Sequence, residues 1–136
     1  MGILGIGVDV LHVPRIAALA RRQSAMRLAS RILSPPELAA WNGIPTVDQE
    51  RRIRFLAVRW SVKEAAYKAL YPTARLTWKE LTFLNTPELM DGQKPVLQYA
   101  PKSSMKSLGR LHSSVSHDGE YIFATVLAET CFEAPD

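Results

Sequence analysis

Three charged residues have the types and spacing expected of a site for phosphoryl chemistry. Asp9 follows the apolar segment GIGV, and Glu64 and Lys68 lie four residues apart in VRWSVKEAAYKAL, residues 58–70. Magnesium is commonly held by one or two protein carboxylates, with water and phosphate oxygens completing its shell. Together with cationic side chains, such a metal offsets the charge of a transferring phosphoryl group. The set therefore indicates a phosphoryl reaction in which Asp9 and Glu64 bind Mg²⁺.

Each of these residues also has a simpler interpretation. Glu64 and Lys68 are one helical turn apart and could form a surface ion pair, which stabilises a helix by about 0.3–0.5 kcal/mol. Asp9 could cap the helix that begins near Pro14, although the N-cap of that helix falls nearer residues 12 and 13. The residues around Glu64 are mostly apolar, so the charges are enclosed and require partners. We therefore favour the metal site.

A second candidate segment is SSVSHDGE, residues 113–120, in which Ser116 and His117 stand at the end of an expected strand. A histidine beside a turn is often only a solvated surface residue. Ser116, His117 and Asp118 are consecutive and cannot face one another as a hydrolase triad, and the chain has no G-x-S-x-G motif. The three histidines lack the spacing of a zinc site.

The first half of the chain is expected to supply a strand and three helices. Residues 3–11 are apolar and rich in Gly, Ile and Val, which predicts a strand, and a helix with a basic outer face follows Pro14. The segment SPPE, residues 34–37, is a capping box that opens a short helix through Trp41. Thr46 and Gln49 repeat that pattern and open a long helix that ends at Leu70.

The second half changes to the period of strands. Residues 80–85 and 95–100 alternate around an Asp91-Gly92 turn and predict a hairpin. Residues 102–110 could form a short helix ended by Gly109, and a tight HDGE turn joins strands at 111–116 and 121–129. The fold class is therefore α+β, with a mainly antiparallel sheet packed against a long central helix, and residues 1–136 form one domain.

Composition favours an anionic partner. The net charge is +4 and the sequence pI is about 9.5. The arginines form two groups, Arg15, Arg21, Arg22, Arg27 and Arg31 and then Arg51, Arg52, Arg54 and Arg59, which predicts two basic faces. No nucleic-acid motif is present, no apolar run approaches the roughly 20 residues of a membrane span, and Cys131 is the only cysteine. We expect neither a nucleic-acid nor a membrane partner.

Three segments taken together resemble a known family. GIGVDVLHVPRI, FLAVRWSVKEAAYKAL and SVSHDGEYIFATV, in this order, resemble the signatures of the 4′-phosphopantetheinyl transferases of the holo-acyl-carrier-protein synthase type. The resemblance covers nearly the whole chain, including RILSPPEL and DGQKPVL. It implies transfer of 4′-phosphopantetheine from coenzyme A to a serine of an apo acyl carrier protein, with release of adenosine 3′,5′-bisphosphate.

The resemblance also implies roles for the charged residues at the reaction centre. Asp9 and Glu64 would bind Mg²⁺ against the pyrophosphate, and Lys68 would contact the phosphates and assist proton transfer. Some relatives carry an acid where this chain has Ala39, so the general base stays open among Glu64, Lys68 and a metal-bound water.

Substrate binding follows from the same resemblance. Arg59, Ser116 and His117 would hold the nucleotide end of coenzyme A, with Lys63 interpreted as a solvated neighbour of Arg59. Arg15 and Arg22 would dock an acidic helix of the carrier protein. The resemblance implies a homotrimer with active sites between subunits.

The sequence leaves open whether the protein is an enzyme or a binding module, and in which compartment it acts. A non-catalytic module of the same fold that binds coenzyme A or a carrier protein is the alternative to the enzyme, and a nucleic-acid-binding module is a weaker one. The wording of RWSVKEAAYKAL and YPTARLTWKEL resembles fungal organellar members, so we expect a mitochondrial location, with the cytoplasm as the alternative.

Overall fold

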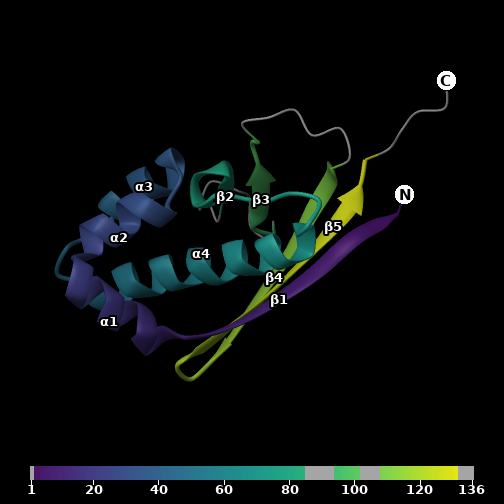
Figure 1. Ribbon diagram of the computed structural model, residues 1–136. Helices are drawn as coiled ribbons and strands as arrows, with labels where there is room; N and C mark the ends of the chain where they lie inside the picture. Colours follow the sequence, from purple (N-terminus) through teal and green to yellow (C-terminus); the bar gives the residue numbers. More distant parts are fainter. Residues whose placement is uncertain (1, 85–93, 102–107, 132–136) are drawn as a thin grey trace.

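The computed structural model describes residues 2–84, 94–101 and 108–131 (Figure 1). The elements in chain order are β1 (Ile3–His12), α1 (Val13–Gln23), α2 (Ala25–Ile32), α3 (Pro35–Asn42), α4 (Gln49–Leu70), the 3₁₀ helix η1 (Trp78–Glu80), β2 (Leu81–Leu84), β3 (Val96–Tyr99), β4 (Leu108–Asp118) and β5 (Tyr121–Thr130). Helices α1 to α3 gather at one end of the molecule, and the start of β1 and the end of β5 lie at the other (Figure 1).

The main sheet has three antiparallel strands in the order β1-β5-β4. Strand β5 lies in the middle because it pairs with both β1 and β4, and a tight turn in which Gly119 has a φ of 55° joins it to β4. Helix α4 runs along one face of this sheet (Figure 1). Asp9 on β1 and His117 on β4 are opposite Ala124 and Ile122 of β5, so the two edges of the sheet carry different candidate site residues.

Two glycines allow β1 and α4 to approach closely. A Cβ atom on Gly5 would lie 2.0 Å from the Ala69 carbonyl oxygen, and one on Gly7 would lie 2.0 Å from the Ala65 carbonyl oxygen. No side chain fits at that separation, since ordinary contact begins near 3.4 Å. The GIG segment therefore sets the spacing between the strand that carries Asp9 and the helix that carries Glu64.

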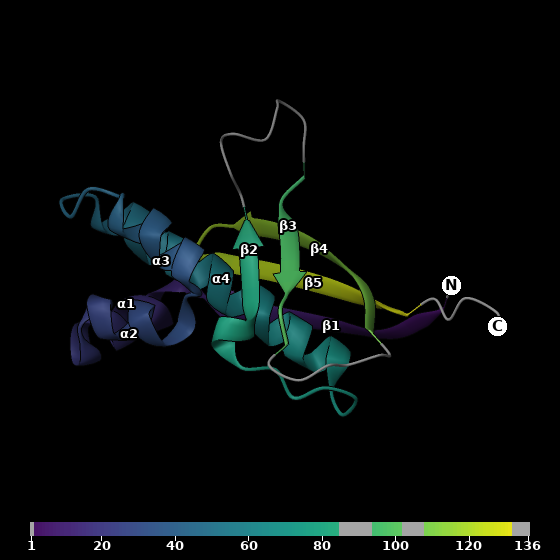
Figure 2. The same cartoon turned by 90° about the horizontal axis from the view of Figure 1, so that it is seen from above.

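The second sheet is a hairpin of β2 and β3 that crosses α4 on the side away from β1 (Figure 2). Buried side chains of the hairpin, Leu81, Phe83 and Leu97, join the core that α4 forms with β5. A second core lies between α4 and the three short helices, around Leu28 and Trp41. Helix α4 is thus enclosed by both sheets and by α1 to α3, which explains why its sequence is apolar on several sides.

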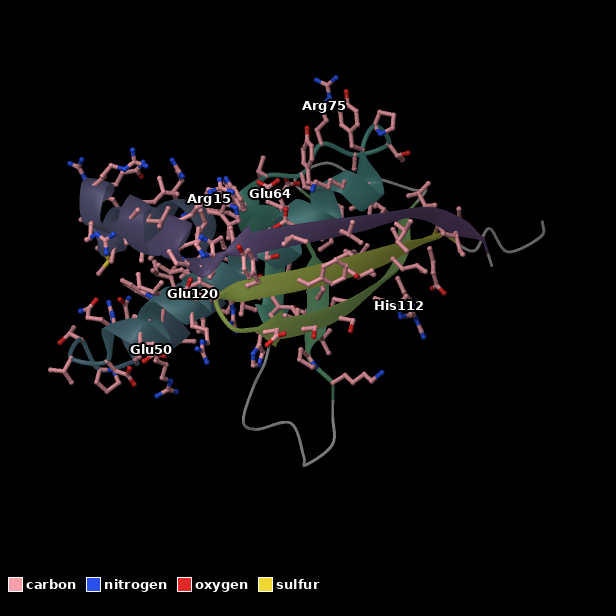
Figure 3. All side chains as sticks on the ribbon, turned by 90° about the horizontal axis from the view of Figure 1, so that it is seen from below. Arg15, Glu50, Glu64, Arg75, His112 and Glu120 are labelled. Carbon is pink, nitrogen blue, oxygen red and sulfur yellow. The ribbon has the colours of Figure 1, made fainter. Side chains whose placement is uncertain are left out.

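The other face of the main sheet is uncovered within the described part of the chain. Its exposed apolar side chains come from both β1 and β5 and include Ile6, Val8, Val10, Tyr121 and Phe123. Viewed from below, this face lies open in front of α4 (Figure 3). A sheet face with this composition is unusual on a monomer and suits contact with another protein surface.

Most of the predicted architecture is confirmed. The class is α+β, both sheets are antiparallel, and α4 is the long central helix. Helix α2 was not predicted; it begins after Ser24, whose φ is 72° and whose side chain accepts a hydrogen bond from the Arg27 N–H.

Three predicted boundaries are wrong or lie outside the described residues. The N-cap of α4 is Asp48 rather than Thr46; the Asp48 carboxylate accepts from the Arg51 N–H, and Gln49 donates to the Thr46 carbonyl. Gly109 lies in β4 and does not end a helix, because it must lie against the Thr130 carbonyl of β5. The Asp91-Gly92 turn and residues 102–107 lie outside the described ranges.

Candidate active site

The seam between β1 and α4 brings Asp9 together with two residues of the helix. The Ser61 hydroxyl donates to Asp9 Oδ2 at 3.0 Å, and Lys68 Nζ lies 3.5 Å from Asp9 Oδ1. Lys68 Nζ also donates to the Val8 carbonyl at 2.9 Å. The carboxylate of Asp9 is mostly buried, at 15% exposure, whereas the lysine side chain is half exposed. The site therefore holds Asp9 in place and leaves part of the Lys68 ammonium facing solvent.

Glu64 belongs to the same electrostatic cluster. Its side chain is partly buried, and burial followed by the charge of Asp9 raises its pKa, while Lys68 and Arg15 act in the opposite direction. Figure 3 shows Glu64 and Arg15 at the β1 edge of the sheet. Two carboxylates in mutual repulsion at one edge form an acceptor for a cation.

The donor set fits the Mg²⁺ ion that the sequence predicts. Asp9 and Glu64 would be its carboxylate ligands from this chain, since the two carboxylates interact with each other. Magnesium is well suited to such a pair, since it retains waters and takes phosphate oxygens. The raised pKa of Glu64 supports this fit because a cation would relieve its repulsion with Asp9.

Ser116 and His117 are not brought to this cluster within one chain. Both are exposed and lie on β4, the strand at the opposite edge of the main sheet from β1. With β5 between them, the two edge strands are separated by two strand spacings, about 10 Å. Ser116 also points to the uncovered face, because its neighbour Val115 packs against the cores beneath α4.

Arg59 lies away from Asp9 and is buried. Its guanidinium is 3.6 Å from the centre of the Phe55 ring, and its Nη2 donates to the Phe83 carbonyl at 3.4 Å. Burial lowers the pKa of Arg59 to about 10, opposed by Glu37, whose Oε2 is 4.0 Å from Arg59 Nε. Only 7% of the residue is exposed, which leaves little surface for the nucleotide contact that the sequence suggested.

The interpretation of Lys63 as a solvated neighbour is wrong. Lys63 is 2% exposed, and its ammonium donates to Glu37 and to the carbonyls of Ile32 and Trp78. Glu37 is equally buried and also accepts from the N–H groups of Ser34 and Phe83. Helical spacing placed Lys63 on the stripe of Arg59, but it could not show that α2, α3 and β2 cover that stripe.

A pocket of about 390 Å³ adjoins Glu64. Its lining combines residues of α4 with residues that follow it, namely Lys63, Glu64, Tyr67, Leu76, Thr77, Trp78 and Leu81. This pocket was not predicted from the sequence, because residues 76–78 reach α4 only through the turn after Leu70. The pocket is mostly apolar, with the Glu64 carboxyl at one side, so it suits an organic group attached to a phosphate.

The basic residues divide between surface and core. Arg15 and Arg22 are exposed on α1, and Arg27 and Arg31 extend the basic surface over α2. The second predicted basic face is partly wrong, because Arg52, like Arg59, is buried. Its guanidinium lies 3.7 Å from the Trp41 ring centre and donates to the Ile44 carbonyl at 2.8 Å. The exposed basic surface thus lies on the helices that follow the Asp9 strand.

Paired carboxylates beside a lysine, placed between a sheet and a central helix, are the residue types expected of a transferase that acts on phosphate groups. The chain belongs to the 4′-phosphopantetheinyl transferase superfamily, whose family model matches residues 5–126. The resemblance stated from the sequence is thereby confirmed, as is its prediction of an enzyme.

Relatives and solved structures agree on the type within the superfamily. A holo-[acyl-carrier-protein] synthase of Burkholderia multivorans is 34% identical over 143 residues, covering 100% of this chain and 93% of that protein. One of Edwardsiella ictaluri is 37% identical over 131 residues, covering 95% and 99%. The crystal structure of a holo-(acyl-carrier-protein) synthase of Bacillus anthracis in complex with CoA (3′,5′-ADP) has a TM-score of 0.72 at 26% identity, covering 95% of this chain and 98% of that one.

Proposed function

We propose that this protein transfers the 4′-phosphopantetheine group of coenzyme A to a serine hydroxyl of an apo acyl carrier protein, with Mg²⁺, releasing adenosine 3′,5′-bisphosphate. The observation that carries the proposal is the grouping of Asp9, Glu64 and Lys68 beside the pocket in a member of this superfamily. The complex of the Bacillus anthracis relative with coenzyme A supports the donor.

The reaction exchanges one phosphate oxygen bond for another. The serine oxygen bonds to the phosphorus that carries pantetheine, and the bond from that phosphorus to the bridging oxygen breaks. Adenosine 3′,5′-bisphosphate leaves with the bridging oxygen, and the serine proton passes to a base. Bound Mg²⁺ would neutralise negative charge on the pyrophosphate.

The residues of this chain have separable tasks in that step. Lys68 is held by the Val8 carbonyl and by Asp9, and its exposed part would contact a phosphate oxygen. Glu64, Lys68 and a metal-bound water are the candidates for the base that accepts the serine proton, with Glu64 also serving as a proposed metal ligand.

The nucleotide end of coenzyme A is assigned to Ser116 and His117 of another copy of the chain. These residues are at the far edge of the sheet from Asp9, so one chain does not join the two parts of the site. The uncovered apolar sheet face offers the surface through which copies would pack. A homotrimer with active sites between its subunits accounts for both features, and mass in solution tests it.

The exposed basic surface of α1 and α2 is proposed to receive the acyl carrier protein. Arg15 interacts electrostatically with Glu64, so a partner bound at Arg15 and Arg22 would have its serine near the reaction centre. No helix among the described residues is long and apolar enough to cross a membrane. The mitochondrial compartment remains a prediction from the wording of the motifs, and imaging of the tagged chain in its own cells tests it.

The test is incubation of the purified protein with apo acyl carrier protein, coenzyme A and Mg²⁺, followed by mass spectrometry of the carrier. We expect the carrier to gain one phosphopantetheine, to gain none when a chelator removes the metal, and to gain none with Asp9→Asn. Glu50→Gln, an exposed carboxylate on α4 outside the site, is the matched control and should behave as the unaltered protein. Binding of coenzyme A without any mass gain would instead identify a non-catalytic module.

A further inference from the structure

A buried charge cluster is formed by Arg59 and Lys63 of α4 and Glu37 of α3. The transfer mechanism does not use it. We propose that Lys63 is a positioning residue: its ammonium fixes the pocket wall, residues 76–78, against Glu64, and thereby sets how coenzyme A is held. The inference rests on the proposed function for the identity of the ligand. The geometry that supports it is independent of that identity.

The ammonium of Lys63 has three hydrogen-bond acceptors from three separate elements. Nζ donates to the carbonyl of Ile32, the last residue of α2, at 2.7 Å. It also donates to the Glu37 carboxylate of α3. The third acceptor is the Trp78 carbonyl at the start of η1, at 2.9 Å. An ammonium has three donors, so all of them are used within the protein. Lys63 is therefore a junction between α4 and the segment that follows it.

This junction lies beside the residue that borders the reaction centre. Lys63 precedes Glu64 in the chain, and both line the 390 Å³ pocket with Leu76, Thr77 and Trp78. The Trp78 ring also packs against the ring of Trp60, with centroids 4.9 Å apart. The bond from Lys63 to the Trp78 backbone is thus a polar contact between the pocket wall and the helix that carries Glu64.

Stability alone is a weak explanation for such a cluster. Removing charges from water costs free energy, and well-packed apolar residues often replace a buried ion pair without loss of stability. The cluster holds two cations against one carboxylate, and Arg59 Nε has no hydrogen-bond partner in the part of the chain that the structure describes. A group that gives little stability but fixes where a segment lies is suited to a role in positioning.

The test compares Lys63→Met with Leu28→Ala. Methionine keeps the approximate length and apolar stem of lysine but has no donor, whereas Leu28 is a buried residue of α2 that does not line the pocket. Each variant is assayed at a temperature where it is folded, with the KM measured separately for coenzyme A and for the carrier protein. Circular dichroism of the paired rings of Trp60 and Trp78 reports the position of the wall without any turnover.

We expect Lys63→Met to raise the KM for coenzyme A roughly tenfold, to change the KM for the carrier by less than about twofold, and to alter the signal of the tryptophan pair. Leu28→Ala should change none of the three. If Lys63→Met does not fold, Lys63→Gln takes its place: its amide retains a donor but is one bond shorter, so the same changes are expected.

An unchanged KM for coenzyme A in the folded variants would overturn the positioning role, and so would an equal change in Leu28→Ala. A tryptophan signal that does not respond to the Lys63 variants would also overturn it. Failure of the proposed function is a different result: the unaltered protein would then transfer nothing from coenzyme A, while the tryptophan signal would still show whether Lys63 holds the wall.

Discussion

The close approach of β1 and α4 makes Gly7→Ala the most informative substitution. The added Cβ would lie 2.0 Å from the Ala65 carbonyl oxygen and 2.7 Å from the Ala69 N–H nitrogen. Ordinary contact begins at 3.4 Å, so strand and helix must separate by about 1.4 Å at this point. Both atoms belong to helix backbone, which cannot rotate away as a side chain can. Overpacking of this kind costs about 3 kcal/mol.

The functional consequence follows from what lies on either side of the contact. Asp9 is two residues from Gly7 on β1, and Glu64 is next to Ala65 on α4. Separation by more than an ångström would disturb the bonds of Ser61 and Lys68 to Asp9 and spread the metal ligands. We therefore expect transfer activity to fall by roughly a hundredfold, even where the variant remains folded.

The assay combines denaturant unfolding with turnover at a temperature well below the transition. Gly43→Ala is the matched control, because Gly43 has a φ of −74° and an added Cβ would lie 3.3 Å from the Ala40 carbonyl oxygen and 3.8 Å from that of Ala39. It should leave both stability and activity nearly unchanged. A Gly7→Ala variant that unfolds within about 1 kcal/mol of the unaltered protein and keeps its activity would refute the reasoning.

Three further predictions test the electrostatics and the surfaces. The pKa of Glu64 is raised in the folded protein, so its carboxylate lowers the free energy of unfolding once the pH rises above the pKa of an unfolded glutamate. With a chelator present, denaturant unfolding should therefore find Glu64→Gln more stable than the unaltered protein at about pH 7. The two proteins should be equally stable near pH 3. Arg22→Glu should raise the KM for the carrier roughly tenfold and leave that for coenzyme A unchanged, whereas the exposed Arg51→Glu should change neither. Phe123→Glu on the uncovered sheet face should lose activity and be a monomer when its mass is measured in solution. Val47 is 90% exposed in a loop, and Val47→Glu should change neither activity nor mass. An active monomer would contradict a site shared between subunits.

The sequence predicted that Asp9, Glu64 and Lys68 lie close together, and the reason is partly local. Glu64 and Lys68 are related by one helical turn, and Asp9 follows on the same strand face as Gly5 and Gly7, which lie against that helix. The structure places all three together. The assignment of Ser116 and His117 to the same site had no such basis, since strand order decides which edge each residue occupies.

Other features could not be read from the sequence because they depend on what covers a surface. Arg59 and Lys63 are charged residues one helical turn apart, which is typical of an accessible helix surface. In the structure they are buried because α2, α3 and β2 pack over them. Glu37 was predicted as a capping residue, and the structure confirms this. Its ion pair with Lys63 was not predicted, because the two residues are 26 positions apart in the chain. Helix α2 was missed because its start depends on the backbone of Ser24.

The sequence by itself determined the family and the antiparallel α+β class, and it predicted that Asp9, Glu64 and Lys68 lie together, because these follow from periodicity and from short ordered motifs. Only the tertiary structure decided which charges face a substrate and which are buried, how closely β1 approaches α4, and that a pocket stands beside Glu64. The physical reason is that burial and contact depend on all the segments that meet at a point. A pattern along the chain describes only one of them.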